Sequence, residues 1–151
     1  MREAPTNFFP LPNEIFMLEL SPGEIAVYAY LLYREDRVTY KCYPSYGTIA
    51  KALHISRNTV RKYVDKLREK RLIDTEQTMV FTRDGKRRNG NLMYTIRPIN
   101  DAVELYFQKQ LARAEKEQEK QRMIDSWEKM QKQNPSETAS FRMNLFESRL
   151  K

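Results

Sequence analysis

Between residues 22 and 71, apolar side chains recur every three to four positions, which predicts a series of helices. The first helix should begin after Ser21, because Ser21 and Glu24 have the spacing of a capping box and Pro22 suits the first helical position. Its apolar positions continue to about Tyr33. The pattern therefore predicts a buried first helix that ends there.

The second and third predicted helices follow each other closely. Ser45 is expected to open the second helix, which ends at a very short turn around residues 54–55. Ser56 then caps the third helix, which runs to about Arg71, and the apolar residue before this cap pairs with Val60 as a hydrophobic staple. Two helices joined by so short a turn form a helix-turn-helix. An ordinary helical corner in another kind of domain is the alternative.

After residue 71 the spacing changes to an alternation of apolar and polar positions. Residues 72–82 and 92–96 alternate, and they predict the two strands of a β-hairpin. The connection between them contains Asp84-Gly85 and Asn89-Gly90, both of which are strong turn signals. A hairpin that directly follows a helix-turn-helix is a wing.

The chain is expected to have four segments. Residues 1–20, apolar and punctuated by proline, predict an extended N-terminal arm, and residues 21–98 predict a winged helix-turn-helix domain. The expected fold class is therefore α+β, mostly α, with a β-hairpin wing. Residues 99–133 predict a long C-terminal helix capped by Asp101, and residues 134–151 predict a linker and an amphipathic tail.

An apolar stripe is predicted on the long helix from Val103 to Met130, with a charged interruption over residues 115–122. Its beginning should pack against the domain. Its later part, from Met123 to Trp127, is expected to be buried against a second copy in a homodimer, because a two-fold DNA site is matched by a dimer. A solvated or frayed helix is the alternative.

The distribution of charge is more informative than the composition. The 151-residue chain has a net charge of +7. Residues 57–98 carry this whole charge, with twelve basic and five acidic side chains. A solvated lysine-rich face is the ordinary explanation, but the concentration on one helix and a hairpin favours a phosphate-binding face. Double-stranded DNA is the predicted partner, and RNA stays open because backbone contacts do not distinguish the two polymers.

Candidate DNA contacts are the positions left outside once the apolar face is buried. The third helix, about residues 57–71, is expected in the major groove, where Asn58 suits adenine and Arg57 or Arg61 suits guanine. The wing, residues 83–91, is expected at the minor groove or backbone. The alternative for the third helix is that these side chains contact phosphates alone. The alternative for the wing is that residues 83–91 form a flexible charged loop. The predicted DNA-binding residues are Ser45, Ser56, Arg57, Asn58, Thr59, Arg61, Lys62, Lys86, Arg87 and Arg88. Lys66 and Lys70, which have acidic neighbours, are expected on a solvated face instead.

Other classes of function are disfavoured by what the sequence lacks. The single Cys42 and the single His54 exclude a disulfide framework, a zinc module and a multi-histidine centre, and the four glycines form no phosphate-cradling loop. We therefore expect no enzymatic activity, no metal and no cofactor. No apolar stretch is long enough to span a bilayer and no signal peptide is recognised, which predicts a cytoplasmic protein with no membrane partner.

Three stretches, Phe8–Phe16, Gly23–Leu31 and Pro44–Ile73, resemble winged helix-turn-helix proteins of conjugative transposons and related mobile elements of Gram-positive bacteria, a replication-initiator-like family. The resemblance covers roughly residues 8–115 and is most specific over Pro44–Ile73. It implies a winged-helix fold and DNA binding in replication initiation or in regulation of a mobile element. His54 stands where such proteins usually have glycine, in a turn that needs a left-handed backbone.

Two further interpretations are considered. A winged helix can also serve as a non-catalytic protein-interaction or architectural module, although the charge clustered on the third helix argues against this. In the tail, Met143–Phe146 faintly resembles the short apolar peptides with which bacterial replication proteins dock on the sliding clamp, and Arg142 stands where glutamine is usual. A tail that is disordered and functionally neutral is the alternative.

Overall fold

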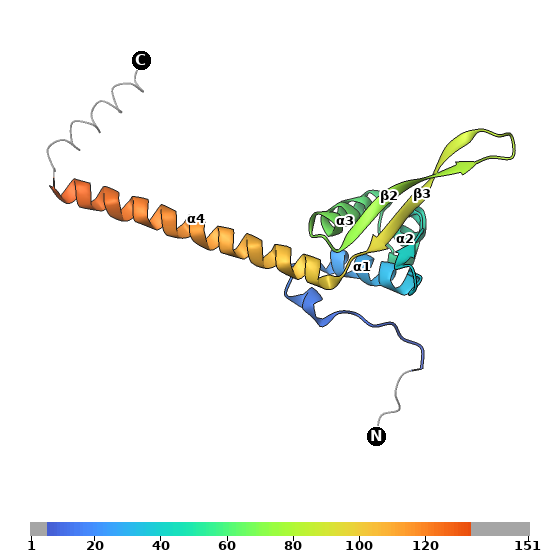
Figure 1. Ribbon diagram of the computed structural model, residues 1–151, viewed down its shortest axis with the longest axis horizontal. Coiled ribbons are helices and arrows are strands. Elements are labelled where there is room, and N and C mark those ends of the chain that lie inside the picture. Colours follow the sequence, from blue (N-terminus) through green and yellow to red (C-terminus); the bar gives the residue numbers. More distant parts are fainter. Residues whose placement is uncertain (1–5, 134–151) are drawn as a thin grey trace, which may run out of the picture. The chain divides into compact units, whose positions relative to one another are not determined.

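The structure, a computed structural model, describes residues 6–133. The chain divides after residue 107 into two compact units. The first unit contains a short 3-10 helix, three helices and a three-stranded sheet, and the last helix begins in it and continues into the second unit (Figure 1). The elements are η1 (Asn13–Phe16), α1 (Pro22–Arg34), β1 (Lys41–Cys42), α2 (Tyr46–Leu53), α3 (Arg57–Glu69), β2 (Ile73–Phe81), β3 (Arg87–Ile96) and α4 (Ile99–Gln133).

Local capping sets where the first three helices begin, as the sequence predicts. The Ser21 hydroxyl accepts a hydrogen bond from the backbone N–H of Glu24 at 3.3 Å, and the Glu24 carboxylate accepts one from the backbone N–H of Ser21 at 3.1 Å. Ser45 and Ser56 cap α2 and α3, each accepting from the backbone N–H three residues later, at 3.0 and 3.1 Å. These bonds satisfy N–H groups that the helix itself leaves without partners.

The turn between α2 and α3 is only three residues long. His54 ends α2 in the left-handed region, at φ 55° and ψ 40°, and its backbone N–H donates to the carbonyl of Ala50. The backbone N–H of Ile55 donates to the same carbonyl at 3.0 Å, so the chain turns sharply before Ser56 starts α3. The helix-turn-helix prediction is confirmed.

The sheet is antiparallel in the order β1-β3-β2, and the hairpin is longer than the sequence suggested. β3 begins at Arg87 instead of residue 92, so the connecting turn is only residues 82–86, with Gly85 at φ 71°. Arg87 and Arg88 are therefore strand residues. The α+β, mostly α winged helix-turn-helix fold with a β-hairpin wing is confirmed.

Asn89-Gly90 is not a turn, contrary to its sequence signal. Gln77 pairs with Leu92 and Met79 pairs with Asn89, so β3 has one residue more than β2 between these pairs, and the strand bulges there. Gly90 fits this position because a side chain would collide with Thr78, whose hydroxyl donates to the carbonyl of residue 91 across the bulge.

The core lies where α1, α2 and α3 meet the sheet. It also receives Ile15 and Leu18, which are almost completely buried. Residues 13–18 therefore belong to the packed domain, which corrects the extended arm predicted over residues 1–20. The buried apolar core comprises Ile15, Leu18, Val27, Tyr28, Leu31, Cys42, Ile49, Ala50, Val60, Val64, Leu67, Leu72, Ile73, Tyr94, Ile96 and Ala102.

The long helix starts two residues before its predicted cap. α4 begins at Ile99, and the Asp101 carboxylate accepts hydrogen bonds from the Arg97 guanidinium at 2.9 and 3.1 Å. Ala102 is buried, and Val103 and Tyr106 pack against the core. The first turns of α4 are thus held by the domain.

In the second unit the apolar side chains of α4 do not form one stripe. With about 3.6 residues per turn, Leu111 and Trp127 point about 160° apart around the helix axis. The apolar stripe predicted from Val103 to Met130 is therefore divided between different faces of the helix. The predicted linker and tail, including Met143–Phe146, lie outside the described residues.

Candidate nucleic-acid interface

Helix α3 exposes the side chains that the sequence assigned to DNA. Val60, Val64 and Leu67 form its buried face. Spacing along a helix then puts Arg57, Asn58, Arg61 and Lys62 outside, and all four are exposed. Within the described part of the chain, the three basic side chains of this group form no ion pair.

The orientation of α3 is fixed by a close approach to α1. The ring of Tyr63 packs directly on Gly23, where even a single added carbon would overlap it. Gly23 therefore allows the two helices to lie close together at this point. The rigid packing behind α3 is what presents its outer face in a defined direction.

Arg57 differs from the other predicted residues of α3 because its side chain lies against α2. Its guanidinium lies over Gly47 near the start of α2, where an added Cβ would be 3.1 Å from Nη2. Arg57, Ser45 and Thr48 line one shallow depression, which Lys51 also borders. The N-terminus of a helix favours anions, so this arrangement suits a phosphate better than the guanine contact suggested by the sequence.

A second depression connects α2 to the root of the wing. Ser45 and Thr48 line it together with Asn91 of β3, whose side-chain amide donates to the carbonyl of Tyr43 at 3.2 Å. Lys41 lines it as well. The start of α3, the start of α2 and the wing root therefore form one continuous surface.

Sequence reasoning missed five charged residues that line this surface, namely the basic Arg34, Lys41 and Lys51 and the acidic Glu35 and Asp36. Arg34, Glu35 and Asp36 lie at or just after the end of α1, Lys41 begins β1, and Lys51 lies on α2, so all of them precede the segment over residues 57–98 that carries the net charge. Packing of the end of α1 and of β1 against the start of α2 brings the other four residues there, whereas Lys51 is on α2 itself. Helical spacing gives a local signal only for Lys51, which lies one turn after Thr48.

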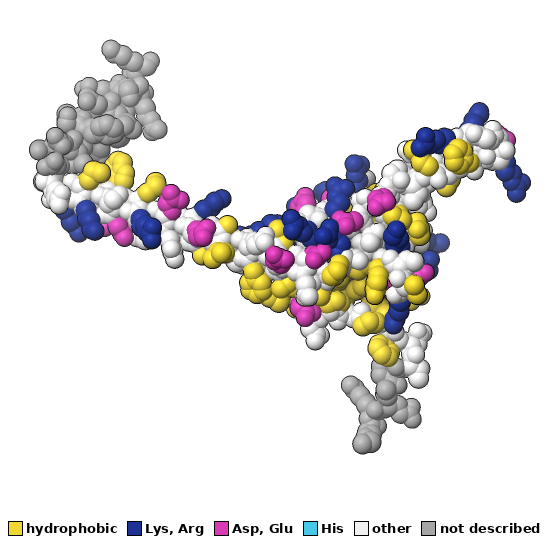
Figure 2. All heavy atoms as spheres, viewed as in Figure 1, with side chains coloured by type: hydrophobic (Ala, Val, Ile, Leu, Met, Phe, Trp, Pro, Cys, Tyr) yellow, Lys and Arg dark blue, Asp and Glu magenta, His cyan; other side chains and the backbone are white. Residues whose placement is uncertain are grey.

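The wing is basic, and its cations point in different directions. Lys86, Arg87 and Arg88 are exposed, and Figure 2 shows Lys and Arg side chains around the hairpin tip and over α3. Arg87 is paired with Phe81 and Arg88 with Val80, so the two arginines lie on opposite faces of the hairpin. Only one of them can face a given groove.

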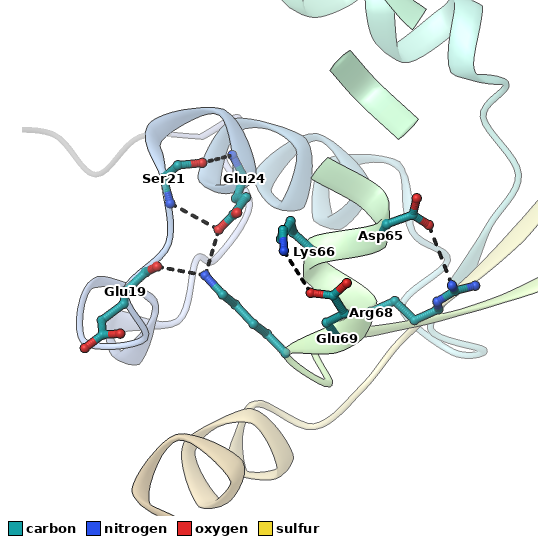
Figure 3. Close-up of polar contacts among 8 residues, drawn as sticks. Glu19, Ser21, Glu24, Asp65, Lys66, Arg68 and Glu69 are labelled. Carbon is teal, nitrogen blue, oxygen red and sulfur yellow. Dashed lines mark hydrogen bonds and ion pairs between the residues drawn. The ribbon is translucent and has the colours of Figure 1, made fainter. Parts of the chain in front are cut away.

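The second half of α3 carries its charge in ion pairs (Figure 3). Lys66 contacts Glu69 at 3.0 Å on an exposed face, as expected. The solvated position predicted for Lys70 is wrong, because its ammonium reaches back to the Glu24 carboxylate at 2.9 Å and to the Glu19 carbonyl at 2.7 Å. Lys70 therefore joins the end of α3 to the start of α1.

Burial shifts the pKa of several groups beneath this surface. Burial, with the nearby Glu35 carboxylate, raises the pKa of the Cys42 thiol to about 12, so it is not a thiolate nucleophile at neutral pH. Burial also raises the pKa of Glu35 and of the Tyr94 phenol. Among residues 6–133, no three His, Cys, Asp or Glu side chains are grouped as a metal site. No helix in this range has the length and apolar character that crossing a membrane requires.

Comparison with known proteins gives one family match and similar solved structures. Residues 18–73 match the family described as "Helix-turn-helix domain". Similar solved structures include a possible transcriptional regulator from Methanosarcina mazei Go1, which is 22% identical with a TM-score of 0.46 over 68% of this chain and 80% of that one. A mutant of S. aureus MepR bound to an oligodeoxyribonucleotide is 17% identical, with a TM-score of 0.38 over 78% of this chain and 81% of that one. No curated protein matches significantly. The match from residue 18 to residue 73 covers α1, α2, α3 and the turn between α2 and α3, and the hairpin that follows is the wing of this fold.

Proposed function

We propose that this chain is a sequence-specific, non-catalytic DNA-binding protein. The observation that carries the proposal is the continuous surface from the start of α3 through the start of α2 to the wing root. In this arrangement α3 lies in the major groove, the α2 N-terminus contacts a phosphate, and the wing reaches the minor groove or its backbone.

The residues of α3 divide into two roles. Asn58 and Arg61 are exposed on the first half of the helix, which is the part that approaches base edges in helix-turn-helix docking. Their side chains suit adenine and guanine respectively. Arg57, Lys62, Ser45, Ser56 and Thr59 are assigned to phosphates, which fix the register without reading sequence.

The test is a selection of bound duplexes from random DNA, followed by titrations of the selected site and a scrambled site. Arg61→Ala should weaken the selected site by about 1–3 kcal/mol and the scrambled site far less. Arg122→Ala, which removes an exposed arginine of α4, is the matched control and should change neither.

The same titrations at increasing salt measure the number of phosphate contacts. Six to eight contacts predict a log–log slope of roughly −5 to −7. A flat salt response contradicts DNA binding through this surface. An equal loss on both sites in Arg61→Ala would make Arg61 a phosphate contact only.

We further infer that the protein acts in transcriptional regulation or replication initiation of a mobile element. This rests on the resemblance over Pro44–Ile73. The genomic position of the selected site decides between the two roles, because a regulator binds at promoters and an initiator binds at a replication origin. Absence of the site from both would remove this part of the proposal.

We also propose a homodimer formed through the later part of α4, where Met123, Ile124, Trp127 and Met130 are all exposed. A two-fold DNA site would match such a dimer. The same exposed patch favours, as a second candidate function, a protein-interaction or architectural module. A failure to select any DNA sequence would favour that second candidate.

A further inference from the structure

The outer half of the wing carries a large apolar side chain that folding does not explain. Beyond the Gln77–Leu92 pair, the residues of β2 are exposed or only half-buried, and the hairpin extends beyond the three helices of the domain (Figure 1). Phe81 ends β2 there with 75% of its surface exposed. Met79 and Val80 before it are about half exposed. Met79 and Phe81 lie on the same face of the strand, and exposed apolar side chains that lie together are typical of a binding surface.

Strand pairing puts Phe81 beside an arginine. Phe81 is paired with Arg87, and Met79 is paired with Asn89. Directly paired residues of antiparallel strands share a face, with Cβ atoms about 5 Å apart. One face of the wing therefore presents the aromatic ring of Phe81, the thioether of Met79 and the guanidinium of Arg87 together.

The bulge at the wing root supports and aims this face. The Gln77 amide donates to the carbonyl of Gly90 at 2.8 Å, and the Thr78 hydroxyl donates to the carbonyl of Asn91. A bulge increases the local twist of a hairpin and redirects the strands beyond it. From Gln77 at the bulge to Phe81 at the end of β2, the strand is about 14 Å long at about 3.4 Å per residue. This exceeds the depth of the minor groove, about 7.5 Å.

The charge around Phe81 indicates the chemistry of its partner. Arg83, Lys86, Arg87 and Arg88 surround the tip, against the single acidic Asp84. The partner must therefore be anionic and must also offer apolar surface. A duplex minor groove does so, because phosphates border it while deoxyribose rings and base edges line it.

We propose that Phe81 is a minor-groove contact that packs on deoxyribose rings and base edges, with Arg87 beside it in the negative potential of the groove. This inference rests on the proposed DNA binding. An anionic membrane also combines charge with apolar depth. DNA is favoured because Asn91 joins the wing root to the α2 surface that continues to α3.

The test compares Phe81→Ala with Phe16→Ala on the selected duplex. Phe16 is the matched control, because its ring is also 75% exposed and it lies in η1, outside the interface. Phe81→Ala should bind about tenfold more weakly with an unchanged salt slope, while Phe81→Leu keeps most of the affinity. Arg87→Gln should reduce the salt slope by about one. Circular dichroism should show the same fold in every variant.

Hydroxyl-radical footprinting supplies a second readout, because it reports on deoxyribose groups exposed in the minor groove. The wild type should protect a patch beside the α3 site that Phe81→Ala leaves open. Unchanged affinity and protection in Phe81→Ala would overturn the proposal while leaving DNA binding intact. The proposal would also be overturned if Phe81→Ala bound DNA as well as the wild type but lost the binding to phosphatidylserine vesicles that the wild type shows. That result would assign the tip of the wing to lipid. A wild type that binds no duplex would remove both this inference and the proposed function.

Discussion

Two ion pairs of α3 have nearly the same length and very different surroundings (Figure 3). Lys66 and Glu69 are 3.0 Å apart, with side chains 56% and 61% exposed. Lys70 and Glu24 are 2.9 Å apart, with side chains 26% and 9% exposed. Glu24 also accepts the capping bond of Ser21, so Lys70 connects the end of α3 to the start of α1.

Lys70→Met should therefore lower the free energy of unfolding by about 1–3 kcal/mol, because it leaves the Glu24 carboxylate nearly buried without its cation. Lys66→Met is the control, and it should change the free energy by at most about 0.5 kcal/mol. Urea unfolding followed by circular dichroism measures both. Equal effects of the two substitutions would show that Lys70 is no more structural than an ordinary surface lysine.

At the scale of elements, the turn between α2 and α3 carries a strained residue. His54 holds a left-handed backbone that glycine adopts without a steric penalty. Its side chain is exposed, so packing does not compensate for that penalty. Glu19, Tyr40 and Arg71 also have a positive φ, but His54 is the one that lies in the turn setting the angle between α2 and α3.

His54→Gly should therefore raise the free energy of unfolding by about 0.5–1 kcal/mol, since the relief of left-handed strain outweighs the extra entropy of glycine in the unfolded chain. His54→Ala keeps the strain and should give no such gain. Thermal unfolding of the three proteins checks the order. A destabilised His54→Gly would mean that the imidazole makes a stabilising contribution of its own.

Elements that depend on neighbouring residues could be predicted from the sequence, and those that depend on another strand or helix could not. Ser21, Ser45 and Ser56 bond to N–H groups three residues away, so their caps are visible as local patterns. Asn89-Gly90 reads locally as a turn, but Gly90 is needed for the approach of Thr78 from the opposite strand. The sequence could not show that approach.

The candidate interface follows the same division. The exposure of Asn58 and Arg61 follows from the period of α3 alone. The position of Arg57 over Gly47 and the pairing of Lys70 with Glu24 depend on how helices pack, so the sequence assigned one to a base and the other to solvent. Helical period predicts which side of a helix is outside, and tertiary packing decides what its side chains reach.

At the scale of the whole molecule, the proposed dimer through α4 bears on whether the proposed DNA-binding surface acts once or in pairs. Met123, Ile124, Trp127 and Met130 are 42–63% exposed and lie on about two turns of helix. Leu111 points about 160° away from Trp127, so one partner helix cannot cover both. A dimer through the later patch alone is small, and we expect a dissociation constant in the micromolar range, about 8 kcal/mol.

Sedimentation at about 1–100 μM protein should then show dimers increasing with concentration. Trp127→Lys should remove them, because it places a charge at the centre of the apolar patch. Leu111→Lys is the matched control on the other side of α4 and should leave the dimer unchanged. On DNA, Trp127→Lys should keep the affinity for a half-site and weaken binding to a two-fold site, since the dimer alone engages both halves. A wild type that remains monomeric throughout, or a Leu111→Lys as disruptive as Trp127→Lys, would show that this patch does not join two copies.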